Sequence, residues 1–215
     1  MKKLGVLFVC LFMFSSNAFC FSFADDEKTD AKERAAKSSR VHKLTDVPCR
    51  ASLKGMKIAV MIAERHSKGQ LSVSQSKYST LFEVINSRLR NLGLSTYNQE
   101  DITRRIAEAE IKAYMNNDPD AALSAAGRLG ANFILRGIIN SRSHVNSILN
   151  INEVYVDMAF TLTSSSGRTI SGATAKSESW AGADTMSAAQ SLVEEQADEI
   201  VAKLYNDFCR KGAAK

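Results

Sequence analysis

The segment DPDAALSAAGRLGANFILRG (residues 118–137) constrains the fold of this chain more than any other feature. Its first two residues, Asp118 and Pro119, are typical of a helix N-cap and first helical position. Gly130 stands where a helix would end in the left-handed conformation. Apolar residues lie at helical spacing before this glycine and alternate after it (Leu123, Ala126 and Leu129, then Phe133, Leu135 and Ile139). The segment therefore predicts a helix, a glycine C-cap and a strand, in that order.

This order argues against a phosphate-binding glycine loop. Such a loop follows a strand and lies at the N-terminus of a helix, because the unpaired backbone N–H groups are at that end. Gly127 and Gly130 instead lie at the carbonyl end of the predicted helix, and the segment has neither G-x-x-x-x-G-K-[ST] nor G-x-G-x-x-G. We expect no nucleotide binding and no cofactor.

The N-terminal residues are typical of a secretory signal peptide. Lys2 and Lys3 precede an apolar run at residues 4–14, and small residues follow it. This run is shorter than the roughly 20 residues that a helix needs to span a bilayer. Cleavage after Ala24 or after Ala18 satisfies the small-x-small pattern. We assign residues 1–24 to the signal peptide and expect a periplasmic protein.

Lipidation of Cys20 would change this expectation, because a lipid would anchor the exported chain to a membrane. A lipoprotein signal has a small residue directly before its cysteine, and Phe19 stands there. We therefore expect cleavage without lipidation, and leave outer-membrane association open.

Residues 25–47 are rich in charge and poor in large apolar side chains. Six acidic and six basic residues lie between Asp25 and Asp46, so this segment cannot bury enough surface to fold alone. We predict a flexible charged tether at 25–47 and one globular domain at 48–215, a length that suits a single core. The formal net charge of the whole chain is only +5, which gives no indication of a nucleic-acid partner.

Cys49 and Cys209 are predicted to form a disulfide. Cys10 leaves with the signal peptide, and Cys20 leaves with it if cleavage follows Ala24. In an oxidising compartment the two remaining cysteines are better interpreted as a bridge than as a metal or catalytic site. Two separate thiols are the alternative.

The periodicity of apolar residues predicts an α/β (α+β) fold with a single mixed β-sheet packed with helices, in the order β-α-β-α-α-β-β-β-α. The short strand at Leu94–Tyr97 and the N-cap at Asn98 are the local signals between the first two helices. The other elements are strands at 56–63, 133–139, 154–162 and 168–180; helices at 78–92, 98–113, 119–129 and 184–208; and polar loops at 64–76 and 140–152.

The sequence contains few residues arranged for catalysis or metal binding. Its three histidines include His66 and His144 in predicted polar loops, and none has a second histidine or a cysteine at metal-ligand spacing. There is no G-x-S-x-G motif, and the serines at 164–166 fit a turn. We expect a non-enzymatic protein. A small periplasmic hydrolase or ligand-binding protein with a pocket near Glu64 and His66 is the alternative.

Exposed aromatic side chains are the other signal of function, since binding surfaces use Tyr and Trp as anchors. Tyr155 lies on the strand face opposite Val154 and Val156, and Trp180 ends the last predicted strand. Tyr155 is exposed if helices cover one sheet face and buried if they cover both, and burial is the preferred interpretation for both residues. The candidate interaction residues are Tyr155, Trp180, His66 and His144.

Four pieces of the sequence, taken in order, resemble the envelope accessory proteins related to LpoB and CsgG. They are KIAVMIA, DPDAALSAAGRLGANFILRG, VYVDMAFTLTSSSGR and the closing helix. The middle domain of FlgT and the amino-terminal domain of TolB look similar in the same way. The resemblance covers most of residues 56–208 and contains no catalytic fingerprint.

The resemblance implies a non-enzymatic domain that docks onto a larger envelope machine. LpoB-like proteins activate a peptidoglycan synthase of the penicillin-binding class, FlgT-like proteins support the flagellar motor, and CsgG-like proteins form a secretion pore. Because the loop at 141–152 looks too short and polar for a membrane hairpin, we do not expect a pore. We expect an envelope protein as partner and leave homo-oligomer formation open.

Overall fold

The computed structural model describes residues 23–65, 71–72, 80–116, 124, 127–181 and 185–212. The chain divides into two compact units, Met1–Ala36 and Lys37–Lys215. The first unit contributes the N-terminal part of α1 (Phe23–Thr45), whose described side chains are exposed there. The second unit holds the sheet and the core.

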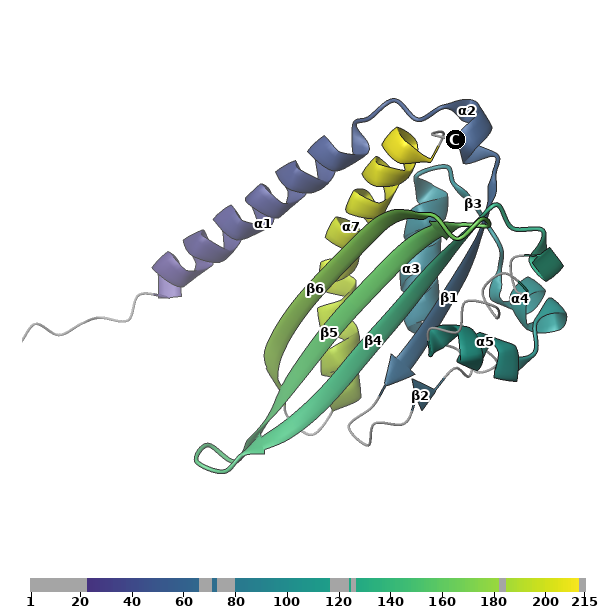
Figure 1. Ribbon diagram of the computed structural model, residues 1–215. Helices are drawn as coiled ribbons and strands as arrows, with labels where there is room; N and C mark the ends of the chain where they lie inside the picture. The colour runs from purple at the N-terminus through teal and green to yellow at the C-terminus, as the bar shows by residue number, and fades with distance from the viewer. Residues whose placement is uncertain are drawn as a thin grey trace, which may run out of the picture. The chain divides into compact units, whose positions relative to one another are not determined.

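One mixed sheet organises the second unit, as predicted, with strands in the order β2-β1-β4-β5-β6 and β3 paired to β1 (Figure 1). The pairs β1–β4 and β1–β3 are parallel, whereas β1–β2, β4–β5 and β5–β6 are antiparallel. The strands are β1 (Lys57–Arg65), β2 (Leu71–Ser72), β3 (Ser95–Thr96), β4 (Phe133–Asn146), β5 (Ile151–Ser164) and β6 (Thr169–Ala181).

β1 is buried on both faces, as its continuous apolar sequence predicts. Every residue from Ile58 to Ala63 is 3% exposed or less. The buried residues of α3 (Thr80–Asn91), α4 (Gln99–Arg105) and α5 (Glu108–Met115) belong to the same core cluster. The centre of the core therefore lies around β1 and the adjoining half of β4.

Within the described residues, helices cover only one face of β5 and β6. α7 (Thr185–Lys211) packs on both strands, and α3 lies beside α7 (Figure 1). The buried stripe of α7 contains the predicted residues Ala189, Val193, Ala197, Ile200, Leu204 and Phe208. The residues of β5 that face α7 are buried (Val154, Val156, Met158, Phe160 and Leu162), whereas those between them are half-buried or exposed. We call the uncovered side of β4, β5 and β6 the open face.

Gly130 ends a helical turn, which confirms the predicted order of helix, glycine and strand. Residues 127–129 are helical, Gly130 has a φ of +62°, and its N–H bonds to the Gly127 carbonyl at 3.2 Å. β4 begins three residues later. The predicted N-cap at Asp118 lies outside the described residues.

The helices before this turn follow local sequence signals with one exception. Gly93 (φ +80°) follows α3, and the Asn98 side chain accepts a hydrogen bond from Asp101 N–H at 2.7 Å as the N-cap of α4. The prediction of one continuous helix at 98–113 is wrong, because Ile106 takes an extended conformation between α4 and α5. The Ile106 side chain at this break lies in the core, where it is 2% exposed.

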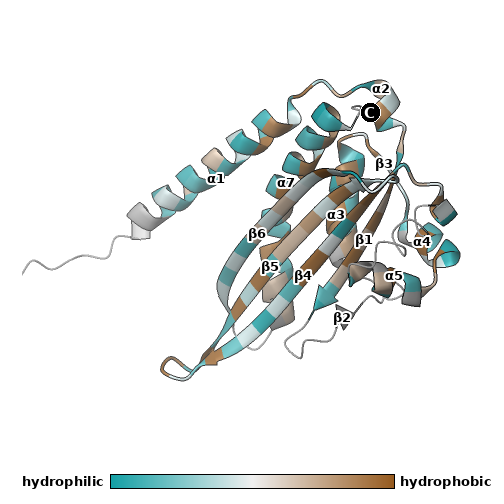
Figure 2. Cartoon of the chain, viewed as in Figure 1, coloured by the Kyte–Doolittle hydropathy of each residue, from teal (hydrophilic) through white to brown (hydrophobic). Residues whose placement is uncertain are grey.

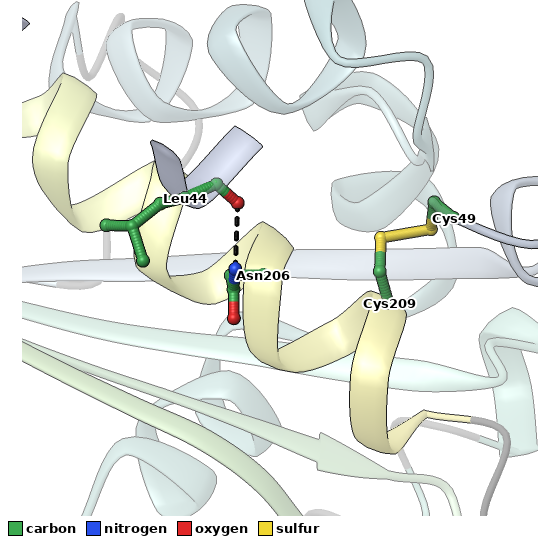
Figure 3. The surroundings of a disulfide bond; sticks show 4 residues. All are labelled: Leu44, Cys49, Asn206 and Cys209. Carbon is green, nitrogen blue, oxygen red and sulfur yellow. Dashed lines mark hydrogen bonds between the residues drawn. A yellow bond between two sulfur atoms is a disulfide. The ribbon is translucent and has the colours of Figure 1, made fainter. Parts of the chain in front are cut away.

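α1 corrects the expectation for residues 25–47, since most of this segment is helical. Within the second unit, Arg40 pairs with Glu199 at 2.7 Å, and Asn206 donates to the Leu44 carbonyl at 3.0 Å (Figure 3). The predicted disulfide joins Cys49 to Cys209 beside this contact. The end of α1 is therefore held against α7. The domain boundaries themselves stay a prediction.

Two predicted loops contain strand residues. β1 continues through Glu64 and Arg65, which pair with β2 inside the segment predicted as the loop 64–76. The prediction of a loop at 140–152 is wrong for most of its residues, because β4 runs to Asn146 and β5 begins at Ile151. The two strands pair without interruption from Phe133–Ser164 to Asn146–Ile151 and form one long hairpin.

Asp207 links α7 to β6 and should make stability depend on pH. Its burial works against the charged form, but hydrogen bonds from Ser171, Lys211 and Lys203 outweigh this and hold the pKa of Asp207 below its ordinary value. A carboxylate with a lowered folded-state pKa contributes stability above the unfolded pKa of about 3.9, and that contribution disappears as the pH falls through the folded value.

We therefore expect Asp207→Asn to lower the melting temperature at pH 7 and to have little effect at the acidic end of a titration. Ser171→Ala should move the loss of stability toward higher pH, because it removes the 2.7 Å hydrogen bond to the carboxylate. Thermal melts from neutral pH into the acid range test both variants. Parallel pH curves for the wild type and Asp207→Asn would show that the linkage is absent.

Candidate interaction surface

On the open face, the outer half of the long hairpin and the adjoining part of β6 align residues from three strands in cross-strand rows. The register aligns His144 with Glu153 and Trp180, and the next row aligns Arg142 with Tyr155 and Glu178. A third row contains Asn140, Asp157 and Lys176. Residues two apart on a strand share a face, so the three rows form one continuous surface.

A short chain of hydrogen bonds fixes the first two rows. Asn146 donates to one oxygen of the Glu153 carboxylate at 2.8 Å, and the Tyr155 hydroxyl donates to the other at 2.7 Å. The bonds from Asn146 and Tyr155 lower the pKa of Glu153, while the bond to Glu153 raises the pKa of Tyr155. Glu153 is therefore held as a carboxylate, and the Tyr155 hydroxyl keeps its proton at neutral pH.

Asp157 interacts with one cation of the second row and with one cation of its own row. Its carboxylate accepts a hydrogen bond from Arg142 at 2.8 Å, and Lys176 lies 3.8 Å away on the other strand. Exposed ion pairs of this kind contribute little to stability. Their effect here is to restrict Arg142 to one region of the open face.

Trp180 is the largest exposed apolar side chain of these rows, with 58% of its surface exposed. The preferred expectation of burial is therefore wrong for Trp180, because no described helix covers this part of the open face. Tyr155 lies on the same face and is half-buried among its neighbours. Three of the four predicted interaction residues, His144, Tyr155 and Trp180, thus lie in two adjacent rows.

The fourth predicted residue, His66, lies outside the described residues, so the alternative pocket near Glu64 and His66 stays a prediction. Arg142, Glu153 and Glu178 were not predicted as site residues. Glu153 and Glu178 alternate with the less exposed Val154 and Ser179, but Arg142 shows no such alternation because Ser143 and His144 are exposed as well. Their common place on the open face follows only from the strand register.

The turn at the end of the hairpin adds a second exposed feature. Asn146 Oδ1 accepts hydrogen bonds from the Ile148 and Leu149 amides at 3.0 and 3.1 Å. Asn150, with a φ of +52°, donates from its amide to the Asn146 carbonyl at 2.8 Å. The turn is therefore well defined, and it leaves the Ile148 side chain 90% exposed.

In the described part of the chain, no three His, Cys, Asp or Glu side chains are grouped closely enough to hold a metal ion. None of the helices in the same residues is both long enough and apolar enough to cross a bilayer.

Comparison with known proteins gives distant structural matches. No model of a known protein family matches this sequence, and no curated protein matches it. The chain is similar to the solved structure of CT253 from Chlamydia trachomatis, with 14% identity, a TM-score of 0.48, and coverage of 73% of this chain and 99% of that one.

It is also similar to the lipoprotein GNA1162 from Neisseria meningitidis, with 12% identity, a TM-score of 0.43, and coverage of 67% and 97%. The LpoB C-terminal domain from Escherichia coli is 15% identical, with a TM-score of 0.36 and coverage of 64% and 91%. LpoB, named in the sequence resemblance, is thus among the similar structures. These likenesses are too distant to assign a family or a function.

Proposed function

We propose that this chain is a non-enzymatic accessory protein of the cell envelope that binds another envelope protein through its open face. The signal peptide predicted from the sequence supports export. The observation that carries the proposal is the row arrangement of Arg142, Tyr155 and Trp180 on an uncovered part of the sheet. Trp, Tyr and Arg are the residue types most enriched among the side chains that dominate protein–protein binding energy.

The order of these side chains before binding strengthens the proposal. Tyr155 is held by Glu153 and Arg142 by Asp157, and all three rows lie on paired strands. A surface ordered in advance loses less conformational entropy when it binds. The mixture of Arg142, Lys176, Glu153 and Glu178 would suit a partner with both charges at its interface.

Crosslinking in living cells followed by affinity purification tests the proposal. The wild-type protein should recover an envelope protein, whereas Trp180→Ala and Arg142→Glu should each reduce recovery strongly. Loss of a dominant interface side chain costs about 2 kcal/mol or more, which is roughly a thirtyfold change in affinity. The peptidoglycan synthases and the flagellar and secretion assemblies implied by the sequence resemblance are the classes of partner to look for.

Lys112→Glu on α5 is the matched control, because it changes the charge of another exposed cation by the same amount. It should recover the partner as the wild type does. The proposal fails if no envelope protein is recovered, or if all four proteins recover the same one in equal amounts while having equal melting temperatures.

A further inference from the structure

The end of the long hairpin is an exposed apolar tip without charged residues. We define the hairpin tip as residues 145–151, VNSILNI. Its four large apolar side chains are exposed: Val145 by 53%, Ile148 by 90%, Leu149 by 58% and Ile151 by 36%. In Figure 2 the turn between β4 and β5 has hydrophobic colours beyond a hydrophilic stretch of β4. Since 24% of the residues of the chain are charged, an exposed apolar end is a departure from the rest of the surface.

The tip is apolar on both sides of the sheet. Ile151 pairs with Asn146 and lies on the open face, whereas Val145 is one residue before Asn146 and lies on the opposite face. Ile148 and Leu149 are in the turn between them. A groove on a protein would cover one side of such an element, but a lipid surface accepts apolar side chains on every side. This distribution favours lipid over a protein groove.

The backbone amides of the turn are also suited to transfer from water into an apolar environment. The amides of Ile148, Leu149 and Asn150 all donate to oxygens of Asn146. An amide without a partner is expensive in an apolar environment, and an amide that is already bonded within the protein avoids most of that penalty. The single residue Asn146 thus satisfies three successive donors at the point that would enter the lipid.

Behind the tip, the side chains follow the order found at membrane interfaces. The first row of the open face contains Trp180 and His144, and the second contains Tyr155 and Arg142. Trp and Tyr are enriched at the level of the lipid headgroups, where one end of the ring is apolar and the other is hydrated. The cations here are balanced by Glu153, Asp157 and Glu178, so attraction to anionic lipid should be weak.

We propose that the hairpin tip inserts into the boundary between headgroups and acyl chains of a lipid bilayer, with Trp180 at the headgroup level. The open face then stands directly beside the membrane, where an envelope protein embedded in that membrane could reach it. This inference goes beyond the proposed protein binding and does not depend on it.

Trp180 is the single tryptophan of the chain, so its fluorescence reports on this place alone. The test uses the protein purified after export and vesicles of phosphatidylethanolamine and phosphatidylglycerol with brominated acyl chains. The wild type should sediment with the vesicles, and Trp180 emission should shift to shorter wavelength and be quenched. Replacing phosphatidylglycerol with phosphatidylcholine should change binding little.

Ile148→Asp and Leu149→Asp should each lower vesicle partitioning about tenfold or more, because a carboxylate resists transfer into the interface. Ala159→Asp adds the same charge at an exposed position of β5 far from the tip, and should bind vesicles as the wild type does. Unchanged melting temperatures establish that the variants remain folded.

The proposal is overturned if Trp180 is not quenched, if the tip variants bind as the wild type does, or if the tip mediates self-association without lipid. Arg142→Glu separates the two proposals, since it should lose the protein partner and keep vesicle binding. Failure of the lipid experiment would leave that crosslinking result intact.

Discussion

Gly137→Ala is expected to lower the free energy of unfolding by about 2 kcal/mol, because overpacking of a filled core typically costs 1–3 kcal/mol. A Cβ atom at this position would lie 2.4 Å from Cε1 and 2.7 Å from Cδ1 of Phe160, and 3.2 Å from Cγ1 of Ile62. The Phe160 ring is 2% exposed, so it cannot move aside without disturbing its neighbours. Urea unfolding with equal m-values measures the difference.

Gly172→Ala is the control, since its Cβ would meet nothing closer than the Phe160 carbonyl oxygen at 3.9 Å. This substitution should change stability by no more than about 0.5 kcal/mol. Phe160→Leu combined with Gly137→Ala should be more stable than the sum of the two single effects predicts, because the smaller side chain makes room for the methyl group. If Gly137→Ala leaves the free energy of unfolding unchanged, the hairpin does not pack against β1 in this way.

Removing the Cys49–Cys209 disulfide should have the largest effect on stability. The bond joins residues separated by 160 positions, and closing so long a loop in the unfolded chain is worth up to about 4–5 kcal/mol in the chain-entropy model. Because measured values fall below that limit, we expect Cys49→Ser with Cys209→Ser to lose about 3 kcal/mol. Denaturant unfolding of the oxidised wild type and the double variant measures this loss.

The reduced wild type serves as the control, and it should unfold at nearly the same denaturant concentration as the double variant. A loss well below about 1 kcal/mol would mean that the end of α1 and α7 stay together through other contacts. The Arg40–Glu199 ion pair and the Asn206–Leu44 hydrogen bond are the contacts to examine then.

The elements that the sequence predicts best depend on local chemistry. Gly93 and Gly130 end helices because their φ values of +80° and +62° suit a residue without a side chain. Asn98 caps α4 through its own side chain. The stripe on α7 is clear because that helix is buried on one side along its length. In each case, the residues that decide the structure lie within a few positions of one another.

The outer hairpin was missed because its strands extend beyond the helices. Alternation of apolar and polar residues arises when one face of a strand is buried, and Arg142, Ser143 and His144 are all exposed. The polar sequence of this segment thus looks like a loop, although both strands are fully paired. Three candidate residues were still found, since Tyr155 and Trp180 are aromatic and His144 is titratable, but their neighbouring positions follow only from the register.

The helix α1 was missed for a different reason. Its sequence has few large apolar residues, which is typical of a chain that does not fold alone. Ala, Glu, Lys and Arg nevertheless favour helix, and oppositely charged residues at i and i+4 add to this preference. Contacts of Lys37 and Arg40 with α7 hold the end of the helix, and a single sequence does not reveal such contacts.

Site-specific photocrosslinking in living cells tests most directly whether the open face is the binding surface. A photoreactive residue at Lys176 or Glu178 should give a covalent adduct with an envelope protein, because both side chains are exposed on that face of β6. The same residue at Ser191 or Glu194, exposed on α7, should give none. Adducts from α7 with none from β6 would contradict the account.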